Sequence, residues 1–282
     1  MPIYKPSELH EFLDGLGIGP KKGLSQNFLI DGNILRKIAS SANLTSDDLV
    51  IEIGSGPGSL TEELLKNGAH VIAIEKDNVL ASALERLKTD GRRLDIYNAD
   101  VLTFPFEEIL APLLTGGRKA KVIANLPYHL TTPIIVQLVK LKHLFSSLIL
   151  MVQDEVARRF VAKPKTSTYS SFTVFLNFYS NPHYSFTVSR NCFYPSPKVD
   201  SAIVSIELKE PLHVSNEEEF FVMTRSSFEQ RRKMLRGSLR EIYPPASIEA
   251  ALSHIGCSPQ ARPEELSIEQ FIQLFERLNK KT

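Results

Sequence analysis

The apolar run "KVIANLPY" ends in an amide, a leucine, a proline and an aromatic ring. The side chain of Asn125 offers a carbonyl oxygen that can accept a hydrogen bond from an amine. The backbone carbonyl of Leu126 can accept a second one, and Pro127, which has no N–H and a fixed φ, narrows the geometry of the turn. Tyr128 can stack on a flat base, a contact worth roughly 1–3 kcal/mol. The run therefore predicts a site for an exocyclic amine on a planar ring.

Such an amine is a poor nucleophile because its lone pair is delocalised into the ring. Two acceptors that hold both amine hydrogens would favour a pyramidal nitrogen and expose the lone pair. Transfer of a methyl group from a sulfonium develops no oxyanion, so we expect positioning to supply much of the rate. We expect no metal site, and we interpret His129 as a lining residue. An ordinary turn that leaves a strand is the alternative for these residues.

A glycine-rich turn and two acidic residues predict a nucleoside pocket. Gly54 and Gly56 lie in "EIGSGPG", a Gly-x-Gly-x-Gly pattern that differs from the Gly-x-Gly-x-x-Gly of dinucleotide sites. Glu75 ends the next apolar segment and could accept hydrogen bonds from ribose hydroxyls. Asp100 follows the third segment and could accept from an adenine amine. S-adenosylmethionine is favoured over a dinucleotide, and a glycine turn beside solvated acids is the remaining alternative. Lys76 and Val101, directly after the acids, are expected to line the same pocket.

The elements that must position these residues alternate along the chain. Apolar strands are predicted at 49–54, 70–75, 94–100, 121–125 and 147–153, with helices between them, which indicates a mostly parallel α/β sheet covered on both faces. Segments 172–180 and 201–208 predict an antiparallel edge hairpin. From residue 216 onward only helices are predicted. We place the catalytic domain at 1–210 and a small all-helical domain at 211–282.

The composition excludes several classes of protein. The net charge of +1 gives no strong overall field, so attraction to nucleic acid must come from local clusters. Two distant cysteines form neither a disulfide framework nor a zinc site. No apolar run approaches the length of a membrane span, and the first residues lack the pattern of a signal peptide. We expect a monomer in the cytoplasm.

A basic stretch predicts where RNA could bind. Between residues 225 and 240 there are six basic residues and one acidic residue, Glu229. The basic residues are Arg225, Arg231, Arg232, Lys233, Arg236 and Arg240. On one continuous helix the apolar residues Phe228, Leu235, Leu239 and Ile242 would form the buried face. A basic stripe beside that face could follow a phosphate backbone and make binding depend on salt. A solvated helix face is the alternative.

These motifs together resemble the KsgA-type ribosomal RNA adenine N6,N6-dimethyltransferases. The similarity covers nearly the whole chain and runs through "QNFL", "EIGSGPGSLT", "NLPY", "NCFYPSPKVDSAIV" and "FEQRRKMLRGSL". It implies the Rossmann-like fold of class I S-adenosylmethionine-dependent methyltransferases. One departure is Ser170-Ser171-Phe172, where relatives often have a glycine and a leucine.

The resemblance also implies roles for single residues and a substrate. It places Gln26, Asn27, Leu29 and Gly54 at the cofactor, with Glu75 on the ribose and Asp100 on the adenine amine. It implies that Phe193 provides a second aromatic ring that stacks on the target base. The implied substrate is a pair of adjacent adenosines in the 3′-terminal hairpin of small-subunit ribosomal RNA, each methylated twice. The implied partner is the immature small ribosomal subunit.

Two other interpretations compete with this one. A methyltransferase for another planar amide, such as protein glutamine, would share an Asn-Pro-Pro-Tyr type of motif, but Leu126 and the basic helical segment argue against it. The second is a ribosome-assembly factor in which catalysis is secondary. The complete set of Asn125, Glu75 and Asp100 argues against an inactive enzyme, although an assembly role could accompany catalysis.

Overall fold

The computed structural model describes residues 3–230 and 232–280, and they form two compact units. The first unit comprises Met1–Ala157 with His183–Lys209, and the second comprises Arg158–Pro182 with Glu210–Thr282. The sequence-based boundary near residue 210 lies where the chain passes from the first unit, at Lys209, to the second, at Glu210. Residues 158–182, expected in the first domain, pack with the C-terminal helices instead.

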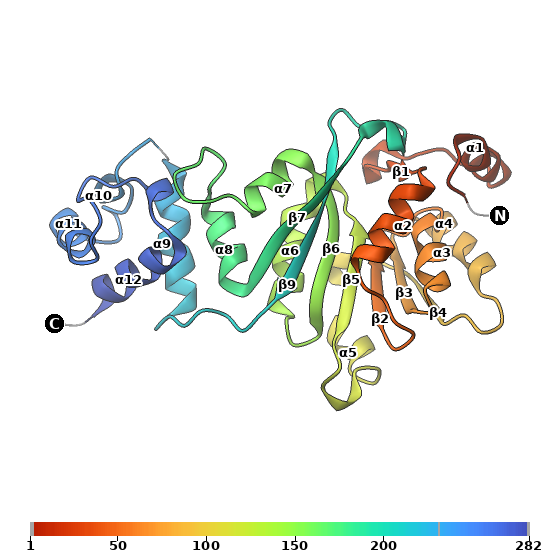
Figure 1. The fold of residues 1–282 in the computed structure, drawn as a ribbon, viewed down its shortest axis with the longest axis horizontal. Helices are drawn as coiled ribbons and strands as arrows, with labels where there is room; N and C mark the ends of the chain where they lie inside the picture. Colours follow the sequence, from red (N-terminus) through yellow and green to blue (C-terminus); the bar gives the residue numbers. More distant parts are fainter. Residues whose placement is uncertain (1–2, 231, 281–282) are drawn as a thin grey trace. The chain divides into compact units, whose positions relative to one another are not determined.

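Nine strands are present among the described residues. They are β1 (Phe28–Leu29), β2 (Leu49–Ile53), β3 (His70–Glu75), β4 (Leu94–Asn98), β5 (Ala120–Asn125), β6 (Phe145–Gln153), β7 (Ser180–Val188), β8 (Phe193–Tyr194) and β9 (Ser201–Leu208). The helices are α1 (Pro6–Gly15), α2 (Gly32–Ser41), α3 (Ser59–Lys66), α4 (Asn78–Ala83), α5 (Phe106–Leu110), α6 (Thr131–Lys140), α7 (Asp154–Phe160), α8 (Ser171–Tyr179), α9 (Glu217–Glu229), α10 (Leu235–Ser238), α11 (Pro245–His254) and α12 (Ile268–Asn279). Figure 1 shows the course of the chain through these elements.

Seven of the strands form the main sheet, in the order β4-β3-β2-β5-β6-β9-β7. The pairs from β4 to β6 are parallel, and β9 joins β6 in antiparallel register with Leu150 opposite Val204. The mostly parallel sheet with an antiparallel edge is therefore confirmed. The chain runs outward from β2 to β4 and then returns to β5 on the other side of β2. Ligands bind at the carboxyl ends of strands where the order reverses in this way.

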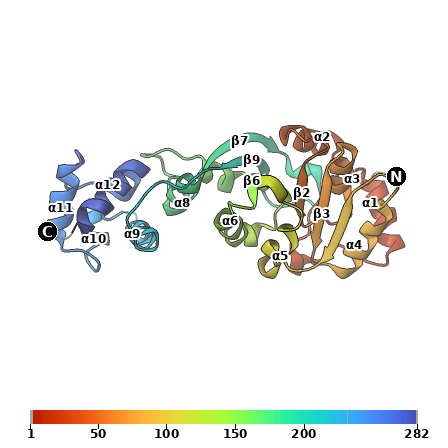
Figure 2. The ribbon, with the colours of Figure 1, turned by 90° about the horizontal axis from the view of Figure 1, so that it is seen from below.

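Alternating side chains of the parallel strands fill both faces of the sheet. One face buries Val50, Val71 and Ile123 together with residues of α2 and α3 such as Leu35 and Leu64. Helices α5 and α6 lie on the opposite side of the sheet from α2 and α3 (Figure 2). Burial on both faces explains the nearly continuous apolar strands and fixes the register that places the strand ends.

In the second unit, aromatic rings make up much of the core. Phe220 contacts Phe178 of α8 and Phe275 of α12, and Phe228 contacts Phe271. The predicted strand at 172–180 is wrong, because most of it is helix α8. The hydroxyl of Ser170 caps the backbone of Thr173, and the Thr173 hydroxyl accepts from the Ser170 N–H in return. This capping box and the spacing of the phenylalanine rings outweigh the β-propensity of the segment.

The continuous helix expected from residue 217 to about 243 is also wrong. Helix α9 ends at Glu229, Gln230 leaves helical geometry with φ −123° and ψ 64°, and α10 begins only at Leu235. The backbone N–H of Leu235 donates instead to the carbonyl of Ala261 at 2.9 Å. This long-range contact stabilises a break that the local sequence, without proline or glycine at 229–235, does not signal. Leu235 and Leu239 are buried as expected, but Ile242 is 41% exposed.

Candidate active site

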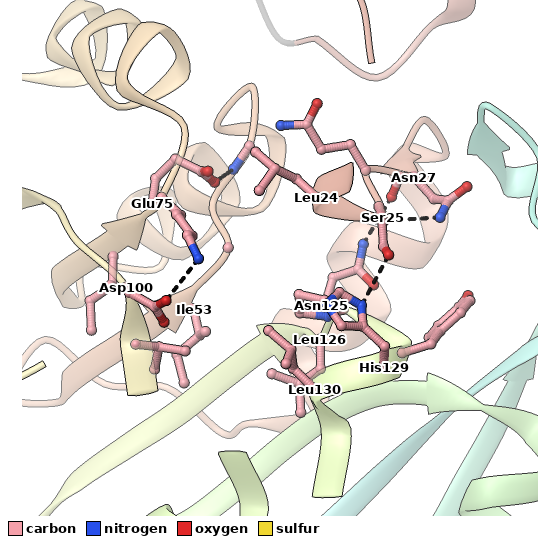
Figure 3. A pocket seen from close by; sticks show the side chains of 18 of the residues that line it. Leu24, Ser25, Asn27, Ile53, Glu75, Asp100, Asn125, Leu126, His129 and Leu130 are labelled. Carbon is pink, nitrogen blue, oxygen red and sulfur yellow. Dashed lines mark hydrogen bonds and ion pairs between the residues drawn. The ribbon is translucent and has the colours of Figure 1, made fainter. Parts of the chain in front are cut away.

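The carboxyl ends of four neighbouring parallel strands line one pocket in the first unit (Figure 3). Gly54 and Gly56 follow β2, Glu75 ends β3, Asp100 follows β4 and Asn125 ends β5. The cofactor loop, which we define as residues 21–29, supplies most of the remaining wall. Predicted site residues that line this pocket are Gln26, Asn27, Gly54, Gly56, Glu75, Lys76, Asp100, Val101, Asn125, Leu126, Pro127 and Tyr128. The parallel register thus brings together residues that lie far apart in the sequence.

The glycine turn holds the carboxylate of Glu75 in a fixed orientation. Gly54 and Gly56 have φ of 73° and 54°, a conformation that glycine adopts without a Cβ penalty. The turn directs the Gly56 N–H to Glu75 Oε2 at 2.7 Å, and the Asp77 N–H donates to Oε1 at 2.8 Å. Burial raises the pKa of Glu75, and these backbone donors oppose the rise. Each oxygen keeps a lone pair with which it can accept a ligand hydroxyl.

Asp100 forms an ion pair across the strand ends with Lys76. Lys76 Nζ lies 2.8 Å from Asp100 Oδ2, and the Leu102 N–H donates to Oδ1 at 3.0 Å. The hydrogen bond from Lys76 is the main cause that lowers the pKa of Asp100. The carboxylate is therefore ionised near neutral pH and stays a strong acceptor. A ligand amine would compete with, or sit beside, the exposed Lys76 ammonium.

The amide of Asn125 is oriented by the cofactor loop. Its Nδ2 donates to the backbone carbonyl of Asn27 at 3.1 Å, which assigns Oδ1 as the acceptor left for a ligand. The Leu126 N–H donates to the Met151 carbonyl at 3.2 Å, so the turn is tied to β6. The next aromatic residue, Tyr128, is half-buried, and its hydroxyl lies 2.7 Å from Ser201 Oγ. Burial raises the pKa of Tyr128, which therefore stays a neutral ring.

Asp77, which was not among the predicted residues, anchors the other end of the cofactor loop. Its side chain is buried and caps α4 by accepting from the Val79 and Leu80 backbone. The same carboxylate pairs with Lys21 Nζ at 2.7 Å and accepts from Gln26 Nε2 at 3.3 Å. An aspartate before a helix is a recognisable cap in sequence. Its partner 56 positions earlier, Lys21, is not recognisable without the fold.

The structure does not bring Leu29 or Phe193 to this pocket. The two pair across β1 and β8, and both side chains are buried in the core that α2 and α3 cover. Leu29 lines an adjoining smaller cavity behind the glycine turn, and Asn125 lines that cavity too. Phe193 is 3% exposed. Pairing with β1 directs its ring into the core, so its expected stacking on a base finds no support in this placement.

The predicted basic residues lie on several elements of the second unit. Arg225 is on α9, Arg232 and Lys233 are in the turn after it, Arg236 is on α10 and Arg240 follows α10. These five side chains are exposed, and Arg231 lies outside the described residues. Because the helix is broken, the straight stripe expected from a single helix is wrong. Arg236 pairs with Glu249 at 2.5 Å and Arg240 with Glu241 at 2.9 Å.

Neither a metal cluster nor a membrane-spanning helix is present in the described part of the chain. Across 3–230 and 232–280, no three His, Cys, Asp or Glu side chains gather in a way that could hold a metal ion. The same residues contain no helix with the length and apolar character of a membrane span.

Comparison with known proteins gives consistent matches. A family model described as ribosomal RNA adenine dimethylase matches residues 19–280. The chain is 61% identical over 278 residues to a protein from Protochlamydia amoebophila named ribosomal RNA small subunit methyltransferase A, covering 99% of this chain and 98% of that protein. A protein of the same name from Chlamydia caviae is 43% identical, covering 97% of each chain.

Two solved structures of methyltransferases are also similar to this chain. A dimethyladenosine transferase from Plasmodium falciparum is 28% identical with a TM-score of 0.75, covering 89% of this chain and 96% of that one. The 23S rRNA methyltransferase ErmE is 31% identical with a TM-score of 0.68, covering 90% of this chain and all of that one. The family match and the placement of the "NLPY" turn beside the glycine turn lead to one assignment. The chain belongs to the ribosomal RNA adenine dimethylase family.

Proposed function

We propose that this chain transfers methyl groups from S-adenosylmethionine to the N6 atoms of adenines in small-subunit ribosomal RNA. The observation that carries the proposal is the orientation of Asn125, whose Nδ2 is held by the Asn27 carbonyl while Oδ1 is left to accept. The similar proteins described above are named as ribosomal RNA methyltransferases and a dimethyladenosine transferase, which supports the same chemistry.

The residues of the pocket fit a methyl donor that carries a nucleoside. Glu75 offers two fixed carboxylate oxygens for a ribose diol, and Asp100 offers an acceptor for an exocyclic amine. Gly56 and Val101 would line the same nucleoside. When bound, S-adenosylmethionine supplies a methyl group on a cationic sulfur that becomes a neutral thioether as the carbon–sulfur bond breaks.

The chain contributes positioning at the other end of the pocket. Asn125 Oδ1 and the Leu126 carbonyl would accept the two hydrogens of the adenine amine, so that its lone pair can form the new N–C bond. The resulting ammonium is acidic and loses its proton to solvent, which requires no strong base. Tyr128 supplies an aromatic ring for stacking, and the fixed φ of Pro127 restricts the backbone of the turn. Holding both reacting groups in line can lower the barrier by up to roughly 7–11 kcal/mol.

We infer that the RNA substrate is the 3′-terminal hairpin loop, in which two adjacent adenines are each methylated twice. This inference rests on the family resemblance. Loop adenines suit a buried pocket, since they cost less to extrude than paired bases. Exposed Arg225, Arg232 and Lys233 are candidates for phosphate contacts, because none of them forms an ion pair within the described part of the chain. We expect a monomer acting on immature small subunits.

The test is to incubate the protein with methyl-labelled S-adenosylmethionine and small subunits that lack the modification, and then to map the label. We expect label on N6 of two adjacent adenosines, with up to two methyl groups each. Asn125→Ala should abolish labelling and change cofactor affinity by no more than a few fold. Asn191→Ala, an exposed amide outside the pocket, is the matched control and should retain full labelling. Label on protein, or unchanged turnover in Asn125→Ala, would refute the proposal.

A further inference from the structure

Ser25, in the cofactor loop, has a backbone conformation that is unfavourable for its residue type. Its φ is 52°, in the left-handed region where a Cβ is disfavoured and glycine is free. The Ser25 hydroxyl lies 3.0 Å from Nδ1 of His129, 104 positions later in the chain (Figure 3). Strained residues persist where surrounding contacts determine them, and they often lie at functional sites.

The contact between Ser25 and His129 joins the same two segments as the Asn27–Asn125 hydrogen bond. Ser25 and Asn27 belong to the cofactor loop, and Asn125 and His129 belong to the turn after β5. Within the loop, Asn27 Nδ2 donates to the Ser25 carbonyl at 3.1 Å. These three hydrogen bonds therefore tie the loop to the turn at two points, and one of the two, the Asn27 carbonyl, orients Asn125.

We propose that Ser25 and His129 are positioning residues that hold the cofactor loop against the catalytic turn, so that Asn125 keeps Oδ1 toward the pocket. This proposal rests on the proposed function, because it assigns Ser25 and His129 to the same reaction. Both residues line the pocket, so the pair links the position of the cofactor loop to the geometry at the amine. It acts through Asn125 and touches no reacting atom.

The bond tolerates either form of the imidazole. A neutral ring can accept from the serine hydroxyl at Nδ1, and a protonated ring can donate to the serine oxygen. Because the contact is exposed to solvent, we expect a variant that loses this hydrogen bond to lose a free energy near the lower end of the range for a net hydrogen bond. That corresponds to about a 2- to 6-fold change in affinity or rate.

The test measures S-adenosylmethionine affinity by calorimetry, and kcat on unmodified small subunits, with the full chain. His129→Gln moves the amide one carbon too far, and we expect weaker binding and a lower kcat. His129→Asn places an amide atom where Nδ1 lies, and we expect recovery to within about twofold of wild type. Ser25→Ala should match His129→Gln, and the double variant should be no worse than either single one, because both remove the same hydrogen bond.

Ser25→Gly separates positioning from a merely structural role. It relieves the left-handed strain, so we expect a higher melting temperature. It also removes the hydroxyl, so we expect lower cofactor affinity and kcat. A structural role alone would move stability and affinity in the same direction.

The outcomes distinguish this inference from the proposed function. Additive losses in the double variant, no recovery in His129→Asn, or unchanged affinity and kcat in Ser25→Gly would overturn the pair while wild-type methylation stands. A wild-type chain that does not bind S-adenosylmethionine would overturn the proposed function itself.

Discussion

A buried glutamate beneath the glycine turn should make stability depend on pH. Glu52 lies in β2, is 2% exposed, and accepts a hydrogen bond from the hydroxyl of Thr61 at 2.5 Å. Burial disfavours the charged form and raises the pKa of Glu52 from 4.5 to about 7, although the Thr61 bond opposes the rise. We therefore expect that Glu52→Gln, which keeps an oxygen for Thr61 but cannot ionise, becomes more stable relative to wild type as pH increases.

The sign and size follow from the two pKa values. Between pH 4.5 and about 7 the folded wild-type chain binds more protons at Glu52 than the unfolded chain does. The stability contributed by this pKa difference is fully present below 4.5 and is lost as pH rises through about 7. At about 1.4 kcal/mol per pH unit, the free energy of unfolding contributed by Glu52 falls by about 3 kcal/mol across that window.

The assay is urea unfolding of wild type and Glu52→Gln at intervals from pH 4.5 to 8. The difference between their unfolding free energies should change by up to about 3 kcal/mol, in favour of the glutamine variant at high pH. Glu108→Gln, at an exposed position on α5, is the control for removing one carboxylate. Parallel curves for Glu52→Gln and wild type would show that burial of Glu52 does not raise its pKa in the folded chain.

Three further perturbations test the pocket and the basic surface. Glu75→Gln replaces a carboxylate oxygen by an NH₂ that faces a backbone donor, and we expect the Kd for S-adenosylmethionine to rise by about 5- to 150-fold, equivalent to about 1–3 kcal/mol, in calorimetry. Asp77→Asn keeps the cap of α4 but removes the ion pair with Lys21, so cofactor affinity should fall a few fold while the melting temperature changes little. Arg232→Glu combined with Lys233→Glu should weaken RNA binding and reduce the slope of log affinity against log salt by about 0.7–0.9 for each phosphate that is no longer neutralised.

Two of these perturbations have a control variant, and all three have a contradicting result. Asp77→Ala removes the cap as well and should lose about 1 kcal/mol of stability, so equal stability in the two Asp77 variants would argue against the capping role. Lys66→Glu combined with Lys88→Glu reverses two exposed charges on the first unit, and it is matched in charge to the basic-surface variant. Equal RNA binding by the two double variants would leave the basic residues of the second unit as an ordinary solvated surface. Unchanged cofactor affinity in Glu75→Gln would show that the ribose contact is misplaced.

Much of the pocket could be predicted because a parallel sheet converts sequence order into spatial neighbours. Three apolar segments end in a glycine, in Glu75 and in Asn125, and this pattern alone predicted that those residues lie together at the carboxyl edge of the sheet. What could not be predicted depends on contacts between distant positions. The Lys21–Asp77 pair spans 56 positions.

The errors in secondary structure have a related cause. Segment 172–180 has strong β-propensity, yet a cap at Ser170 and ring packing make most of it helical. The break after Glu229 depends on the Ala261 carbonyl, which no local pattern indicates. The position of Phe193 also depends on a distant partner, because pairing with Leu29 buries the ring in the core, and its stacking on a base stays a prediction.

The proposed reaction requires that Asn125 Oδ1 and the Leu126 carbonyl accept the two hydrogens of a flipped adenine amine. A crystal structure of the chain with S-adenosylhomocysteine and an RNA hairpin that presents the unmodified adenines would measure this contact. We predict that adenine N6 lies about 2.7–3.2 Å from both oxygens and faces the cofactor sulfur. An adenine bound with N6 directed away from Asn125, or an Asn125 amide rotated so that Nδ2 faces the base, would contradict the role assigned to this side chain.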